Sequence, residues 1–97
     1  MRKFGIVKTT TLQTNATQIV GPSEKRHALY FSPPQGANEY TVSTEASVQF
    51  GGGINLSAAS GGFLVTAELY GDAVSKPWFG AASGTNLVVG FVESTME

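Results

Sequence analysis

The chain has 97 residues, a formal net charge of −1 and only 13% charged residues. A chain of this length forms a single domain, because two separate cores would each be too small to be stable. The balance of 6 basic and 7 acidic residues argues against nucleic acid as a partner, since nucleic-acid binders concentrate basic side chains on one surface.

Short runs rich in β-forming residues follow one another along the chain, with turn residues between them. In chain order, they are residues 18–20, 28–31, 40–44, 63–69, 78–82 and 87–92. Clusters of Gly, Pro, Ser and Asn break the chain about every 8 to 15 residues, too often for helices of ordinary length. The sequence predicts an all-β fold without helices, a compact antiparallel β-sandwich that is jelly-roll-like. Residues 1–20 are expected to form an extended N-terminal arm and a first strand, and residues 21–97 the sandwich.

Alternation within the runs predicts which side chains reach the core. Leu29 and Phe31 share one face of their run, and we expect both to be buried. The partners expected across the sandwich are Ile54, Leu56, Leu64, Val89 and Phe91. Residues 87–92 are apolar on both faces, which predicts a central strand or one covered on both sides. Residues 40–44 are expected to have one wet face, on which Thr41 and Ser43 lie.

No set of polar residues matches a known catalytic or metal-binding pattern. Cysteine is absent and His27 is the only histidine, so neither a thiolate site nor a two-histidine metal site is possible within one chain. Ser83 lacks the Gly-x-Ser-x-Gly order of a nucleophile turn, and residues 51–56 lack the ending of a phosphate-binding loop. Glu68 and Asp72 are interpreted as solvated charges that close a strand. We therefore predict a protein that is not an enzyme and has no metal or cofactor.

Contact with a partner is the remaining class of function. Arg2, Lys3 and Lys8 alternate with apolar or neutral residues such as Phe4, a pattern typical of a basic strand that adds to a neighbour's sheet. Lys25 and Arg26 follow Glu24 at the start of a strand, where charge forms a polar rim that could dock on an acidic neighbour. Trp78 is a further candidate for an exposed contact. The predicted partner-binding residues are Arg2, Lys3, Phe4, Lys8, Lys25, Arg26 and Trp78.

Other features bear on location and on rival functions. The N-terminus lacks the apolar run of a signal peptide, and no stretch approaches the roughly 18 apolar residues of a membrane helix, so we expect a soluble protein made without export. A carbohydrate-binding module remains an alternative, because exposed aromatic side chains could form a row. The candidates for that row are Tyr30, Tyr40, Tyr70 and Trp78. A small hydrolase would need an acid, base or nucleophile set that the sequence does not supply.

Three stretches together resemble small virion-associated proteins of tailed bacteriophages: "EKRHALYFSPPQGANEYTVST", "GGGINLSAASGGFLV" and "GDAVSKPWFGAASGTNLVVGFVES". The shared outline is Arg-x-x-Leu before an apolar strand, a Gly-Ile-x-Leu element, and an aromatic-Ala-x-x-Ser-Gly-Thr hairpin that leads into a Val-rich strand ending in Glu. The residues that occupy it are Arg26, Leu29, Gly53, Ile54, Leu56, Phe79, Ala81, Ser83, Gly84, Thr85 and Glu93. The resemblance covers about residues 22–94.

The resemblance implies a β-sandwich displayed on a virion, as a capsid decoration (cement) protein on the outer surface of a phage head or as part of a head or tail fibre. Its partner would then be the major capsid protein or another virion protein, and the chain would be synthesised in the cytoplasm of the bacterial host. Decoration proteins often sit at points of local threefold symmetry, so a homo-oligomer is expected, with a trimer favoured. In this picture, residues 1–11 reach across the underlying shell. Neither nucleic acid nor a membrane is an expected partner.

Overall fold

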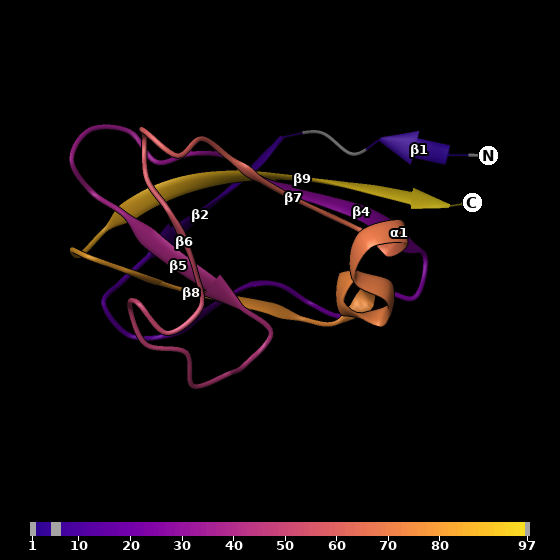
Figure 1. The fold of residues 1–97 in the computed structure, drawn as a ribbon, viewed down its shortest axis with the longest axis horizontal. Helices are drawn as coiled ribbons and strands as arrows, with labels where there is room; N and C mark the ends of the chain where they lie inside the picture. Colours follow the sequence, from indigo (N-terminus) through magenta and orange to yellow (C-terminus); the bar gives the residue numbers. More distant parts are fainter. Residues whose placement is uncertain (1, 5–6, 97) are drawn as a thin grey trace.

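The computed structural model describes residues 2–4 and 7–96, which form a sandwich of two antiparallel sheets (Figure 1). The five-stranded sheet has the order β1-β9-β4-β7, with β2 also paired to β9, and the four-stranded sheet has the order β3-β8-β5-β6. The strands of the first sheet are β1 (Arg2–Phe4), β2 (Lys8–Leu12), β4 (Arg26–Phe31), β7 (Phe63–Thr66) and β9 (Leu87–Met96). Those of the second are β3 (Thr17–Val20), β5 (Tyr40–Ser43), β6 (Ile54–Leu56) and β8 (Trp78–Ala82). The predicted all-β sandwich is confirmed.

Strand β9 organises the five-stranded sheet. It pairs with β4 on one side and with both β1 and β2 on the other, so it is the central strand that its apolar sequence predicted. The two N-terminal strands lie end to end along β9, from Arg2 opposite Met96 to Leu12 opposite Leu87. The N-terminal segment, which was predicted to be an extended arm, therefore pairs with β9 of its own chain. The edge of β9 supplies the backbone hydrogen-bonding groups for both β1 and β2.

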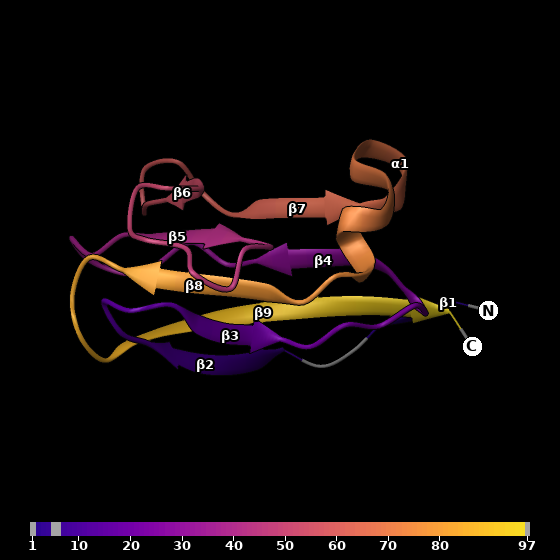
Figure 2. The same cartoon turned by 90° about the horizontal axis from the view of Figure 1, so that it is seen from below.

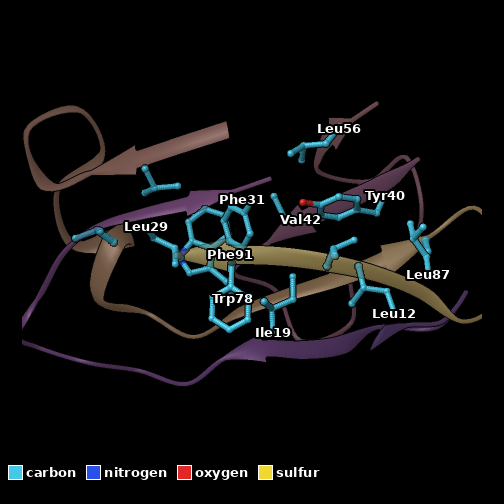
Figure 3. Close-up of a cluster of buried hydrophobic side chains, with 14 residues drawn as sticks. Leu12, Ile19, Leu29, Phe31, Tyr40, Val42, Leu56, Trp78, Leu87 and Phe91 are labelled. Atoms are coloured by element: carbon cyan, nitrogen blue, oxygen red, sulfur yellow. The ribbon is translucent and has the colours of Figure 1, made fainter. Parts of the chain in front are cut away.

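Both sheets contribute side chains to one core (Figure 3). Leu29 and Phe31 are fully buried, as their alternation predicted. The prediction was wrong for Leu64 and Ile54, which are both exposed, whereas Val65 is buried. Leu64 lies opposite Tyr30, on the face of β4 that turns away from the core. Further core members are Leu12, Ile19, Tyr40, Val42, Leu56, Val74, Trp78, Ala82, Leu87, Val89 and Phe91.

A short helical segment interrupts the all-β pattern. The α-helix α1 (Ala67–Tyr70) runs into the 3₁₀ helix η1 (Gly71–Ser75), although no helix was expected there. The Thr66 side chain accepts a hydrogen bond from the backbone NH of Leu69, which caps the helix, and Gly71 has a φ of 59° at its end. In both views this segment lies at the end of the sandwich that holds the two termini (Figures 1 and 2).

The loop between β5 and β6 covers the outer side of β5. Thr41 is buried there, which corrects the expectation of a wet face on this strand. Its hydroxyl accepts a hydrogen bond from the backbone NH of Gly51 and donates one to the side chain of Asn55. Asn55 in turn donates to Glu39. The loop supplies the partners that a buried hydroxyl needs.

None of the helices in the described ranges is both long enough and apolar enough to span a bilayer.

Candidate binding surface and the polar cluster beside it

Arg26 lies at the centre of a buried polar cluster at one end of the sandwich. Only 3% of its surface is exposed, and its Nε donates to Oε2 of Glu93 at 2.8 Å. Nη1 donates to the carbonyl oxygens of Val74 and Lys76 at 3.0 and 3.1 Å, and Nη2 donates to that of Gly21. The guanidinium therefore joins β4 to β9, to η1 and to the loop before β4, which leaves it no free face for a partner.

The burial of Arg26 corrects the prediction that it forms part of an exposed rim. A planar group with five donors suits a site where several carbonyl oxygens and a carboxylate converge. Lys8, a second predicted contact residue, lies with its Nζ 3.6 Å from Oε1 of the same Glu93. The structure thus brings two predicted site residues to one carboxylate, as internal ion pairs.

His27 and Ser94 form a separate polar contact next to this cluster. Nε2 of His27 lies 2.8 Å from Oγ of Ser94, across the pair of strands β4 and β9. Ser94 is buried in the middle of a strand rather than presented on a sharp turn, which is how a nucleophilic serine is commonly exposed. We interpret the contact as one that satisfies a buried hydroxyl.

Trp78 is part of the core, which corrects its prediction as a contact residue. It is 4% exposed, and its indole Nε1 donates to the carbonyl oxygen of Ala73 at 3.0 Å. Its ring centroid lies 5.6 Å from that of Phe31 and 6.4 Å from that of Phe63, and Figure 3 shows Trp78 beside Phe31 in the core. The indole is buried because η1 supplies an acceptor for its one polar group.

Burial of Trp78 and Tyr40 also removes the aromatic row of the carbohydrate-binding alternative. Tyr40 is fully buried, and its hydroxyl donates to the carbonyl oxygen of Ser32. Burial raises the pKa of this hydroxyl well above its usual value of 10.0, and nearby Tyr30 adds to the shift. Of the four candidate rings, only Tyr30 and Tyr70 are exposed.

The other candidates are placed as follows. Lys25 is exposed in the turn before β4, whereas Arg2, Lys3 and Phe4 lie on β1, where the backbone register is described and the side chains are not. Ser83 accepts a hydrogen bond from the backbone NH of Glu39, so it closes a loop. The remaining pair, Glu68 and Asp72, is exposed on the helical segment rather than at a strand end.

The most distinctive surface is the side of the five-stranded sheet that faces away from the core, which we call the outer face. Tyr30, Leu64 and Val92 lie side by side on it in neighbouring strands. Tyr30, Leu64 and Val88 are 38%, 50% and 59% exposed, although each is large and apolar. On β2, β4, β7 and residues 88–94 of β9, its positions are Thr9, Thr11, Ala28, Tyr30, Leu64, Thr66, Val88, Gly90, Val92 and Ser94.

No Asp, Glu, Lys or Arg occupies these ten positions, and the nearest charged residue on the same side of the sheet is Arg2, which lies opposite Met96 at the end of β9. The apolar sequence of β9 predicted a central strand or one covered on both sides; β9 is central, and the exposure of Val88 shows that the rest of the described chain does not cover its outer side there. The alternation of residues 88, 90 and 92 was the signal for this surface. Leu64 could not be assigned to it from the sequence, because residues 63–65 are all apolar.

Two shallow hollows give the outer face its relief. One has a volume of about 340 Å³ and lies around Gly90, bordered by Thr9, Ser32, Pro33, Gln35 and Val88. The other, of about 80 Å³, is lined by apolar atoms between Tyr30, Leu64 and Val92. Neither is enclosed. They suit contact with side chains of another protein better than capture of a small molecule, which usually needs a cavity that surrounds most of the ligand.

Comparisons with known protein families, with curated proteins and with solved structures each find no match for this chain. Its function is therefore argued from the residues and their geometry.

Proposed function

We propose that this chain is a non-enzymatic structural protein of a tailed-bacteriophage virion, a capsid decoration protein that binds the outer surface of the head. The observation that carries the proposal is the uncharged outer face with its exposed Tyr30, Leu64 and Val88. Soluble monomers rarely expose a continuous apolar patch of more than a few hundred Å² unless the patch contacts another molecule. The outer face has the composition of an interface core, where charged residues are depleted.

The architecture supports a structural role. The Arg26 cluster ties β4 to β9, to η1 and to the loop before β4, and the rings of Phe31 and Phe63 on one sheet pack against that of Trp78 on the other. A rigid sandwich presents a flat sheet face with little loss of conformational entropy on binding. Such a body suits a protein that adds to the surface of a larger assembly.

Several residues of the phage-like sequence pattern have a structural role. Arg26 and Glu93, the charged residues that begin and end the pattern, contact each other through their side chains. Leu29, Leu56 and Ala81 from the same pattern are buried. The residues of the pattern thus include some that build the sandwich. This supports the proposal that the chain is a protein of the type it resembles.

The proposal assigns contact with other virion protein to the outer face rather than to a free arm of residues 1–11. Its reason is that β1 and β2 already pair with β9 of the same chain. The partner is the major capsid protein or another virion protein that offers an equally uncharged surface.

Labelling of virions tests the proposal. An antibody raised against the purified chain is applied to gradient-purified particles from a lysate of the bacterium that carries the gene, and the label is located by electron microscopy. We expect label over the whole head surface. Label confined to the tail would indicate a fibre-associated protein, and chain that stays in the soluble fraction would refute a virion role.

A further inference from the structure

We infer that the outer face is a self-contact surface, on which a second copy of this chain stacks its own outer face about a two-fold axis. The inference rests on the proposed function only in taking the outer face as a contact surface. It names a second copy of this chain as the occupant of that surface in the free protein, a copy that the virion protein replaces when the chain binds the head.

Charge is the first argument for a second copy. A partner with Lys, Arg, Asp or Glu at the contact would bury those charges against ten positions that supply no counter-charge. Burying an unpaired charge is strongly unfavourable, so the occupant has to be uncharged over the same area. The outer face of another copy meets this requirement, since Glu93 and Lys8 are paired with each other and the Glu93 carboxylate with Arg26, away from the outer face.

Area is the second argument. The strands run along the longest axis of the molecule, and Figure 1, viewed down the shortest axis, shows β9, β4 and β7 along the upper side with β5 and β8 below. The outer face therefore spans at most 38 Å along the strands and 20 Å across them. A rectangle of that size approaches the roughly 800 Å² that each partner contributes to a standard protein interface. A two-fold contact of standard size would therefore have to use nearly the whole face.

Relief is the third argument. The knobs and hollows alternate on the face: Val88 projects beside the hollow at Gly90, and Leu64 projects beside the smaller hollow next to Tyr30. Gly90 creates its hollow because it places no side chain between Val88 and Val92. Two such faces can interdigitate, as the inner faces of packed sheets do about 10 Å apart.

The symmetry of this contact makes the inference testable. In a two-fold contact, residues near the axis face the same residue of the other copy. Tyr30 lies on β4, one of the two inner strands, between Leu64 on β7 and Val92 on β9. It is therefore the exposed residue closest to the middle of the face, where the axis is expected to pass.

The experiment uses Tyr30→Glu and Tyr30→Lys in the full chain. Sedimentation equilibrium over a concentration series should give twice the monomer mass of 10.1 kDa for the parent. Either variant alone should dissociate at least about 100-fold more readily, because two like charges would face each other without water. An equimolar mixture of the variants should regain the dimer as a heterodimer, since the introduced charges are then opposite. With one of the two variants uniformly labelled with ¹⁵N, native mass spectrometry can identify the heterodimer by its intermediate mass.

Leu69→Glu is the matched control, because Leu69 is an exposed apolar residue on α1, outside the outer face. It should keep the parent's dimer, and circular dichroism should show that all variants remain folded. A parent that stays monomeric overturns the inference, as does a trimer whose mass is unchanged by both charges. If the chain is monomeric but the antibody still labels phage heads, the self-contact is refuted and the proposed function is not. If the chain is dimeric but absent from virions, the proposed function is refuted and the self-contact is not.

Discussion

Nε of Arg26 lies 2.8 Å from Oε2 of Glu93, and this ion pair joins two residues that are 67 positions apart in the chain. Because the same guanidinium also holds carbonyl oxygens of η1 and of the loop before β4, one side chain closes this end of the sandwich. The two strands that the ion pair connects, β4 and β9, are the inner strands of the outer face.

Removing this guanidinium should strongly destabilise the fold. We expect Arg26→Met to lower the free energy of unfolding by about 3 to 5 kcal/mol, because three carbonyl oxygens lose their donor and the partly buried Glu93 carboxylate keeps only its longer contact with Lys8. Urea unfolding of the variant measures the loss. Lys25→Met is the control, since Lys25 is exposed and its loss should cost no more than about 0.5 kcal/mol. Equal midpoints for the two variants would contradict the role of Arg26.

The core prediction concerns the aromatic rings between the sheets. Phe31→Ala should cost about 3 to 5 kcal/mol, because Phe31 is fully buried and contacts the rings of both Phe63 and Trp78. Leu64→Ala, half exposed on the neighbouring strand, should cost much less. Thermal melting followed by circular dichroism compares them, and a larger loss for Leu64→Ala would show that the faces of β7 are assigned the wrong way round.

The buried hydroxyl of Tyr40 should make the free energy of unfolding depend on pH in the alkaline range. Its pKa is raised in the folded state, so above about pH 10 the unfolded chain loses this proton while the folded chain keeps it. The folded state then binds more protons, and stability falls as pH rises from about 10 toward the folded pKa, by at most about 1.4 kcal/mol per pH unit.

The test compares the parent with Tyr40→Phe in urea at several pH values. Below pH 10 the variant should be less stable by about 0.5 to 1.5 kcal/mol, since the hydrogen bond to Ser32 is lost. The difference should shrink or reverse above pH 10, because the variant has no hydroxyl to titrate. A constant difference across the series would contradict the burial of this group.

At Gly62, beside the outer face, the backbone lies close to Tyr30 and to the backbone of Phe31. A Cβ atom at this position would lie 2.6 Å from the carbonyl oxygen of Phe31 and within contact of the Tyr30 ring, so Gly62→Ala requires the backbone to shift. We expect a cost of about 1 to 3 kcal/mol, the usual range for overpacking. Gly21→Ala is the control, because its nearest neighbour would be a Gln18 side-chain atom at 3.6 Å. A melting temperature for Gly62→Ala equal to that of this control would show that the approach is looser than described.

The sequence by itself determined the fold class and much of the core. Strand β8 spans residues 78–82 as predicted, and β4 contains the predicted run 28–31, because β-forming residues are gathered there and turn residues flank them. Leu29 and Phe31 could be assigned to the core because side-chain alternation in a strand is a local property. The central position of β9 followed from its two apolar faces in the same way.

Only the tertiary structure decided which polar and apolar groups are exposed. Arg26 is buried because Val74, Lys76 and Glu93, all distant in sequence, converge on its guanidinium together with the nearby Gly21. No local sequence pattern indicates such a convergence. Residues 63–65 are all apolar, so alternation alone allows two equally good assignments of the faces of β7. Pairing with β4 selects the assignment in which Leu64 lies on the exposed side. The N-terminal strands pair with β9 of their own chain because that edge lies within reach once the sandwich has formed. Exposure depends on what the rest of the chain places against a residue, which is a property of packing and not of local sequence.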